Sequence, residues 1–193
     1  MSEPLEQDTV IVTGASSGIG AATCRELAAA GANVVLAARS EERLEAVADD
    51  LEAEHGVETL VVPTDVREED DVDALIEATV DRFGGLDVLV NNAGLARGSD
   101  VESLTTEEYE TMQATNVDGV FYATRAAIPH VREGSGHLIF VGSFAGQYPR
   151  PFNPVYAASK WWVRGFAKSV AAQVGDDGVG VTIVNPSEVR SEF

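Results

Sequence analysis

Short runs of β-branched and aliphatic residues alternate with longer amphipathic stretches along the chain, and this alternation limits the possible folds most. The short runs are typical of buried strands, and the longer stretches repeat their apolar residues with the period of a helix. Strands that alternate with helices predict an α/β fold: a doubly wound parallel sheet with helices on both faces and right-handed crossovers. The expected strands are residues 9–12, 33–38, 59–62, 88–90, 137–141 and 179–184, and the expected helices are residues 21–30, 41–54, 69–83, 105–128 and 155–174.

The ends of two expected elements have specific signals. Thr105 and Glu108 have the spacing of a capping box and predict a helix start, and Pro129 predicts that this long helix ends near Ile128. Cys24 falls inside the first expected helix, where we expect it to pack in the core.

Length and composition predict one globular domain. A chain of 193 residues can bury a sizeable core, its 45% hydrophobic content suits such a fold, and no low-complexity linker divides it. We therefore expect residues 1–193 to form a single domain. The N-terminus lacks the basic start and apolar core of a signal peptide, and no apolar run approaches the roughly 20 residues of a membrane helix. A single cysteine excludes an intramolecular disulfide and fits a reducing compartment, so we expect a cytoplasmic protein.

The chain is strongly acidic. Thirteen Lys and Arg residues stand against 32 Asp and Glu, for a formal net charge of -19, and Lys160 and Lys168 are the only lysines. Such a surface repels nucleic acid and anionic membranes, so neither is an expected partner. The excess of acidic over basic residues favours an adaptation to high salt, and an ordinary acidic cytoplasmic protein is the alternative.

A glycine-rich turn, residues 13–20 with the sequence TGASSGIG, joins the first expected strand to the first expected helix. Glycines in this place let the backbone approach a pyrophosphate, and the free amides at the helix start favour its charge. The spacing is G-x-x-x-G-x-G instead of the commoner G-x-G-x-x-G, and a tight turn without a ligand is the alternative. Ligands of such sheets bind beyond the carboxyl ends of the strands, so we expect the turn, Asp65, Asn91 and Ser143 to meet at that edge.

Arg39 and Ser40 follow the second expected strand, where the choice between NAD and NADP is normally made. An acidic residue there would bind the ribose hydroxyls of NAD, whereas a basic residue accommodates the additional phosphate of NADP. Arg39 offers a planar pair of donors to a phosphate, and Ser40 offers a further hydroxyl. The alternative is an exposed arginine that pairs with Glu42 or Glu45.

Tyr156 and Lys160 lie at positions i and i+4 of an expected helix, so their polar ends share one side of it. A phenol with its ordinary pKa of about 10 is a poor proton donor or acceptor at neutral pH. A fixed ammonium nearby favours the phenolate and makes the phenol usable as a general acid or base. Ser143 is a candidate to hold a carbonyl or alcohol oxygen beside the phenol. A chance Tyr and Lys on a solvated helix face is the alternative.

Taken in order, these motifs resemble those of the short-chain dehydrogenase/reductase family, whose members are nicotinamide-dependent oxidoreductases. The resemblance implies a Rossmann-type fold, NADP(H) as cofactor, a small-molecule carbonyl or alcohol substrate, and a homo-oligomer (a dimer or a tetramer). No metal is expected, because His55, His130 and His137 show no metal-ligand spacing. The matching positions, which cover nearly the whole chain, are residues 13–20, Asp65-Val66, Asn91-Asn92-Ala93-Gly94, Asn116, Ser143, Tyr156 and Lys160.

The resemblance also implies roles for single residues. Tyr156 would donate or remove the proton, and Lys160 would favour its phenolate and bind the nicotinamide ribose. Ser143 would orient the substrate oxygen, with an ordinary turn serine as the alternative. Asn116 would disturb its helix locally and hold a water in a proton relay, with a surface or capping asparagine as the alternative. The implied cofactor-binding residues are Gly14, Ser16, Ser17, Gly18, Ile19, Gly20, Arg39, Ser40, Asp65, Val66, Asn92, Tyr156, Lys160, Pro186 and Val189.

Within the cofactor set, Asp65 and Val66 would flank the adenine, Asn92 would hold the ribose region, and the Val189 backbone would contact the nicotinamide amide. Two features depart from the family's pattern. Ser187 stands where the family usually has glycine after a proline, which restricts the local backbone. The sequence also stops at Phe193, where the family normally continues with a substrate lid, another helix and a last strand. We expect these parts to be absent, with a longer chain whose tail was left out as the alternative.

Residues 91–98 and 110–126 look closest to the NADP-dependent 3-hydroxy-acid (serine-type) dehydrogenases of the family. A ketoreductase acting on acyl-carrier proteins and a sugar dehydrogenase are alternatives within it. A sensor or scaffold that binds NADP(H) without turnover is an alternative of a different class. The presence of all four expected catalytic residues, Asn116, Ser143, Tyr156 and Lys160, argues against that last alternative.

Overall fold

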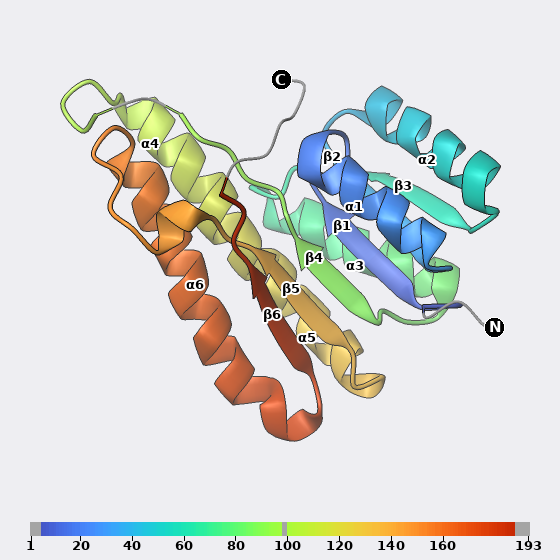
Figure 1. Ribbon diagram of the computed structural model, residues 1–193. Coiled ribbons are helices and arrows are strands. Elements are labelled where there is room, and N and C mark those ends of the chain that lie inside the picture. Colours follow the sequence, from blue (N-terminus) through green and yellow to red (C-terminus); the bar gives the residue numbers. More distant parts are fainter. Residues whose placement is uncertain (1–4, 98–99, 188–193) are drawn as a thin grey trace.

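The computed structural model describes residues 5–97 and 100–187, which fold around one six-stranded sheet. All five strand pairings are parallel, and the strand order is β3-β2-β1-β4-β5-β6 (Figure 1). The strands are β1 (Thr9–Thr13), β2 (Asn33–Ala38), β3 (Thr59–Pro63), β4 (Val88–Asn91), β5 (His137–Val141) and β6 (Gly180–Val184). The helices are α1 (Gly18–Ala29), α2 (Glu41–His55), α3 (Glu69–Phe83), α4 (Thr106–Gln113), α5 (Gly119–Glu133) and α6 (Pro154–Val174).

The strand order reverses between β1 and β4. The chain first builds outward from β1 to β3, then crosses back to place β4 on the other side of β1. At such a switch point the loops after the two neighbouring strands diverge and leave a crevice at the carboxyl edge of the sheet. The predicted doubly wound parallel sheet in a single domain is therefore confirmed, and its geometry puts a ligand site beyond β1 and β4.

Two apolar cores fix the helices on the sheet. On one face, α1 and α2 bury a core that includes Leu44 and Leu51, both fully buried, against the side chains of β1 and β2. On the opposite face, α3, α5 and α6 bury a larger core around Leu138 and Phe140 of β5. Figure 1 shows this three-layer arrangement, with α6 running beside β5 and β6. Alternate side chains of each strand enter opposite cores, because successive residues of a strand point to opposite faces.

Cys24 lies in the core between α1 and the sheet, as expected, with no exposed surface. Burial raises the pKa of its thiol to about 12, so the reactive thiolate is scarce at neutral pH. The packing interpretation of this cysteine is therefore confirmed.

The helix expected over residues 105–128 ends later than predicted. It begins as predicted, since the Thr105 hydroxyl accepts from the Glu108 amide and Glu108 bonds back to the Thr105 amide. A π-helical turn, Ala114–Asp118, then separates α4 from α5. The helix also continues through Pro129 to Glu133, since a proline in the last turns removes one backbone bond while the fully buried Val131 keeps that end packed on the sheet.

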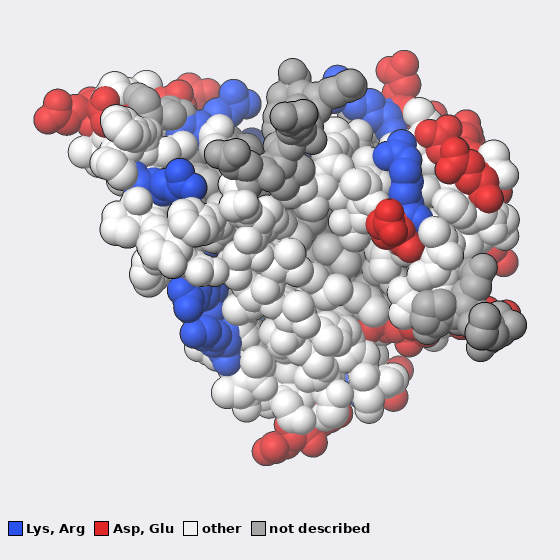
Figure 2. Space-filling model, in the orientation of Figure 1, with Lys and Arg blue, Asp and Glu red and all other residues white. Residues whose placement is uncertain are grey.

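Figure 2 shows how charge is distributed over one face of the molecule. Asp and Glu side chains gather at the rim, over α2 and near the start of α4, while the surface over β5 and β6 carries few charges. Basic side chains lie along α6 on this face. Within the described part of the chain, no helix is long and apolar enough to cross a membrane.

Candidate functional site

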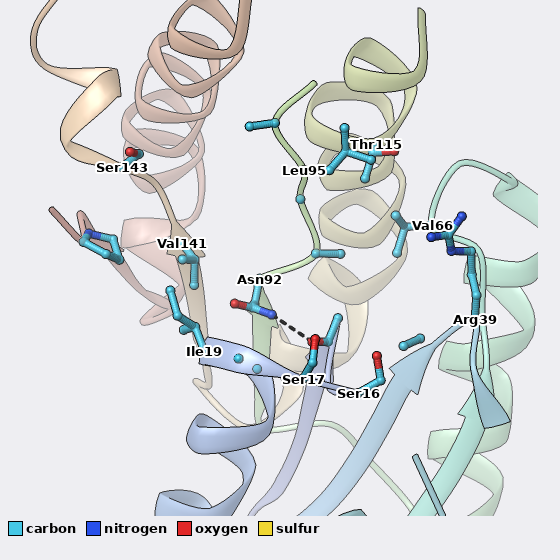
Figure 3. A pocket seen from close by; sticks show the side chains of 18 of the residues that line it. Ser16, Ser17, Ile19, Arg39, Val66, Asn92, Leu95, Thr115, Val141 and Ser143 are labelled. Atoms are coloured by element: carbon cyan, nitrogen blue, oxygen red, sulfur yellow. Dashed lines mark hydrogen bonds between the residues drawn. The ribbon is translucent and has the colours of Figure 1, made fainter. Parts of the chain in front are cut away.

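A cavity of about 840 Å³ lies at the carboxyl edge of the sheet, next to the switch point between β1 and β4. Its walls come from the loops after β1, β2, β3, β4, β5 and β6 and from α6. In Figure 3, Arg39 and Ser143 lie at opposite ends of the cavity, with Ser16, Ser17 and Asn92 between them. The cavity is therefore elongated and has one polar end near α2 and another near α6.

The glycine turn after β1 is closed so tightly that Gly14 and Gly20 leave no room for a side chain. Gly14 has a φ of +68°, a conformation that favours glycine, and a Cβ on Gly20 would lie 2.1 Å from the Gly14 carbonyl oxygen. α1 starts directly behind this turn, and Ser17, the residue before its first turn, makes no side-chain capping bond. The amides of the first turn of α1 therefore keep their donors for a ligand, in contrast to the capped start of α4.

Asn92, directly after β4, holds this turn from the other side of the switch point. Its side-chain Nδ2 donates to the carbonyl oxygens of Thr13 at 2.8 Å and Gly14 at 3.2 Å. The Thr13 hydroxyl in turn accepts from the backbone amides of Asn92 and Ala93, each at 3.0 Å. These bonds tie the loops after β1 and β4 into one rigid floor of the cavity.

The end of the cavity near α2 is rich in arginine. Arg39 follows β2 as expected, and the lining also includes Arg43, Asp65 and Arg67. Within residues 5–97 and 100–187, Arg39 makes no ion pair, so its predicted alternative pairing with Glu42 or Glu45 is not observed. Among the described residues, no carboxylate is paired with the N–H donors of the Arg39 guanidinium, so these donors are available to a ligand.

The other end of the cavity holds Tyr156 and Lys160, which share one side of α6. The Lys160 Nζ lies 6.0 Å from the centroid of the Tyr156 ring and donates to the Val141 carbonyl oxygen at 2.9 Å. Lys160 is only 6% exposed, and burial lowers the pKa of its ammonium to about 8. A pKa of about 8 still leaves this lysine mostly cationic at pH 7, so it supplies a positive charge beside the phenol.

Asn116 lies inside the π-helical turn and is fully buried. Its carboxamide accepts from the Leu95 amide at 2.9 Å, and its Nδ2 donates to the Leu95 carbonyl at 2.8 Å and to the Ser159 hydroxyl at 3.0 Å. The expected local disturbance of the helix is therefore present. Both N–H donors of the side chain are used to join the loop after β4 to α6, and a water relay at Asn116 stays a prediction.

Ser143 begins the short turn after β5, where its hydroxyl oxygen accepts from the Ala145 amide at 3.1 Å. It thus has the turn-capping contact that the alternative reading predicts, and it also lines the cavity together with Tyr156. Its O–H makes no hydrogen bond to another described residue, so this hydroxyl has a donor to offer to an oxygen in the cavity.

Most of the predicted cofactor residues line the cavity together. Asn91, which was expected at the same edge, does not line the cavity. Its side chain points to the face of the sheet that α5 covers, where it is buried and donates to the Thr124 hydroxyl. Asn116 acts from behind the lining, and Val189 lies outside the described residues. The predicted residues that the cavity brings together are Gly14, Ser16, Ser17, Gly18, Ile19, Gly20, Arg39, Ser40, Asp65, Val66, Asn92, Ser143, Tyr156, Lys160 and Pro186.

Sequence reasoning missed several polar residues at this site, among them Arg43, Arg67 and Ser159. Arg67 had a signal, since it directly follows the Asp65-Val66 motif. Ser159 had a weaker one, since it precedes Lys160 and its hydroxyl donates to the Tyr156 carbonyl at 2.7 Å. Its bond to Asn116 joins positions 43 residues apart, and no local pattern reveals such a contact.

The residues present fit a nicotinamide dinucleotide. The excluded side chains at Gly14 and Gly20 and the uncapped start of α1 form a cradle suited to a pyrophosphate. Arg39 and Lys160 both line the cavity and offer it cationic donors. In the described residues, no cluster of three or more His, Cys, Asp and Glu side chains is arranged to hold a metal ion.

Relatives of known sequence match nearly the whole chain. An uncharacterized oxidoreductase of Staphylococcus aureus (strain USA300) is 37% identical over 186 residues, which are 96% of this chain and 79% of that protein. An uncharacterized oxidoreductase of Listeria monocytogenes is 35% identical over 192 residues, which are 98% of this chain and 77% of that protein.

Solved structures with the same fold include two that contain NADP or a derivative. An alcohol dehydrogenase from the archaeon Thermococcus sibiricus, complexed with 5-hydroxy-NADP, superposes with a TM-score of 0.91 at 32% identity, covering 94% of this chain and 77% of that one. A metagenomic short-chain oxidoreductase in complex with NADP has a TM-score of 0.90 at 36% identity, covering 96% of this chain and 85% of that one.

The family described as short chain dehydrogenase matches residues 8–193, a stretch that contains the whole sheet and the cavity at its carboxyl edge. Sequence, fold and the shape of the site therefore agree, and the chain belongs to the short-chain dehydrogenase/reductase family of nicotinamide-dependent oxidoreductases.

Proposed function

We propose that this protein is an NADP(H)-dependent oxidoreductase that transfers a hydride between nicotinamide and the carbonyl or secondary alcohol group of a small molecule. The observation that carries the proposal is one elongated cavity with Tyr156 and Lys160 at one end and Arg39 at the other, where Arg39 has no ion pair among the described residues. The solved relatives that hold NADP or a derivative of it support the choice of cofactor.

In this proposal Arg39 and Ser40 bind the phosphate that distinguishes NADP from NAD, because a guanidinium offers paired donors to phosphate oxygens. Neither residue is acidic, and an acidic side chain at this place would favour the free ribose hydroxyls of NAD. Asp65 and Val66 flank the adenine, and Asn92 steadies the loop beside the ribose.

The chemistry in this proposal takes place at the end near α6. When bound, the nicotinamide supplies or accepts the hydride. Tyr156 gives a proton to the substrate oxygen during reduction and takes it back during oxidation. The buried ammonium of Lys160 favours the phenolate form that results, and Ser143 donates its hydroxyl hydrogen to the same substrate oxygen. Asn116 keeps the loop at Leu95 and α6 in register, so that these groups hold their positions.

A 3-hydroxy acid is the substrate that we propose within this class. The support is the likeness of residues 91–98 and 110–126 to the serine-type dehydrogenases. Both stretches border the cavity, through Asn92 to Arg97 in the first and Thr115 in the second.

The test is NADPH oxidation with a panel of ketones and 3-oxo acids, for the wild type and for Tyr156→Phe. The variant loses the transferable proton but keeps the ring, so we expect NADPH binding to be preserved and turnover to fall by about 10²–10⁴-fold. Tyr109→Phe is the matched control, because Tyr109 lies exposed on α4, and it should retain full activity.

A Tyr156→Phe enzyme with more than about a tenth of the wild-type rate would contradict the proton-transfer role. A wild type that binds NADPH tightly but turns over no member of the panel would favour the sensor or scaffold alternative instead.

A further inference from the structure

Arg67 forms a salt bridge with the carboxylate of Asp65 at the end of the cavity near Arg39. Its guanidinium Nε donates to the two carboxylate oxygens at 2.9 and 3.0 Å, and its Nη2 donates to Oδ2 at 2.5 Å. The Arg67 backbone amide adds a bond of 3.1 Å to Oδ1. Such a paired, planar contact is the strongest form of an arginine–carboxylate interaction.

Asp65 is also within the electrostatic reach of Arg39. The pKa of the Asp65 carboxyl is lowered chiefly by the hydrogen bonds from Arg67, and the charge of Arg39 lowers it further. Asp65, Arg67 and Arg39 all line the cavity. An ionised carboxylate at this place competes with a phosphate for the Arg39 guanidinium. It also repels any phosphate that Arg39 binds.

The two arginines do not share this carboxylate in the structure. Asp65 has its ion pair with Arg67, whereas Arg39 makes no ion pair with any residue in the described ranges. The side chain of Asp65 is 19% exposed and that of Arg67 is 35% exposed, so water only partly screens the carboxylate. The charge of Asp65 therefore bears on the neighbouring phosphate site unless a cation neutralises it.

We infer that Arg67 sets the preference for NADP(H) by neutralising Asp65, which leaves Arg39 free for the additional phosphate. This inference rests on the proposed function. It assigns Arg67 a positioning role that acts through Asp65 and Arg39 and needs no contact between Arg67 and the phosphate.

A double-mutant cycle on Asp65 and Arg67 tests the inference, with the ratio of the NADH to the NADPH dissociation constant as the readout. The ratio removes any loss of adenine contact, because both cofactors carry the same adenine. Binding is measured by fluorescence or calorimetry for the wild type, Arg67→Gln, Asp65→Asn, the double variant and Arg39→Ala. Arg132→Gln is the matched control, since Arg132 pairs with Asp177 through an Nε–Oδ2 bond of 2.7 Å and does not line the cavity.

We expect Arg67→Gln to lower the ratio by about tenfold through weaker NADPH binding, with NADH binding nearly unchanged. In the Asp65→Asn background the same Arg67 substitution should leave the ratio at or above its wild-type value, since no carboxylate then remains to be neutralised. Arg132→Gln should leave the ratio as in the wild type.

A ratio that stays low in the double variant overturns the inference, because Arg67 would then bind the phosphate directly. An unchanged ratio in Arg67→Gln, or an equal fall in Arg132→Gln, overturns it as well. The proposed function is judged separately: it fails if the wild type shows no preference for NADPH or if Arg39→Ala does not reduce that preference.

Discussion

At the scale of single residues, Lys160 carries its charge where water hardly reaches it. The side chain is 6% exposed and its Nζ has one protein hydrogen bond, to the Val141 carbonyl. A Cβ placed on Gly94 would lie 3.4 Å from this Nζ and 3.3 Å from the Asn116 Oδ1, so these polar groups crowd around residue 94. Burial of a cation in this place opposes folding and lowers the pKa of Lys160 to about 8.

The first prediction is that Lys160 makes stability rise with pH. Below about pH 8 the lysine is charged in both states, and the folded protein bears the full burial penalty. Between about 8 and the ordinary value of 10.5 the folded state releases the proton first, so the penalty disappears as pH increases. Over this range the free energy of unfolding of the wild type should gain up to about 3 kcal/mol relative to Lys160→Met.

Urea unfolding of the wild type and of Lys160→Met at pH 7 and pH 10.5 measures this difference. Lys168→Met is the control, because Lys168 is exposed on α6 and is the only other lysine. Stability curves of the wild type and Lys160→Met that run parallel over this range would show that Lys160 is not charged at a penalty in the folded protein.

The sequence predicted the Tyr156–Lys160 arrangement because it depends only on helix geometry. The same local reasoning located Arg39 and the glycine turn at the ends of strands. It did not reveal that Lys160 is buried, or that Asn116 bonds to Leu95 and Ser159, because these facts depend on the packing of α6 against distant loops. The places of these residues on a helix or at a strand end were thus predictable, and their burial and hydrogen-bond partners were not.

At the scale of elements, the start of α1 has no room for a side chain at Gly20. A Cβ on Gly20 would lie 2.1 Å from the Gly14 carbonyl oxygen and 2.7 Å from the Asn92 Nδ2. Gly165, inside α6, has no atom within 4 Å of the same position, although it is also a helical glycine. A side chain therefore fits at Gly165 and does not fit at Gly20.

Our second prediction contrasts these glycines. Gly20→Ala should open the turn, lower the melting temperature and abolish detectable cofactor binding, since the backbone must move away from Asn92. Gly165→Ala should raise the free energy of unfolding by roughly 0.5–1 kcal/mol, because alanine is the better helix former at an open site. Thermal melts with and without NADPH measure both effects, and a Gly20→Ala protein that binds NADPH as the wild type does would refute the tight-turn interpretation.

Element positions followed closely from the sequence where the signal was local. The limits of β2, β5 and α3 agree with the expected residues, because apolar period and flanking turns determine them. A local disturbance of the helix at Asn116 was implied by the family resemblance, but its form as a π-helical turn was not, because it depends on the bond from Asn116 to the loop after β4. The continuation of α5 past Pro129 likewise depends on tertiary packing.

At the scale of the whole molecule, the formal charge of -19 produces repulsion among the acidic side chains, which opposes compaction. Our third prediction is that the melting temperature and activity rise from low salt to molar potassium chloride. Salt of that concentration shortens the screening length to about 3 Å, from about 10 Å at 0.1 M, and so weakens the repulsion. Neutralising Glu45 and Asp49, both exposed on α2, should reduce this salt dependence.

Thermal melts and rate measurements over a potassium chloride series provide the test. A melting temperature that is constant over the series would contradict an adaptation to high salt. A salt response that is equal in the wild type and in the Glu45→Gln, Asp49→Asn double variant would show that charges elsewhere are responsible.

The hydrogen bonds from Asn92 to the glycine turn can form only late during synthesis on the ribosome. Its bonds reach back 79 residues to Thr13 and 78 residues to Gly14, so β1, α1, β2, α2, β3 and α3 are all synthesised before this amide emerges. Before β4 docks beside β1, the turn can have the bonds from the Gly14 and Ala15 amides to the Ala37 carbonyl of β2, but it lacks those from Asn92. Long-range pairings of this kind form late. A nascent chain therefore carries the glycine-rich sequence well before it carries the completed turn, and a ligand of this turn is expected to act on the late steps of folding.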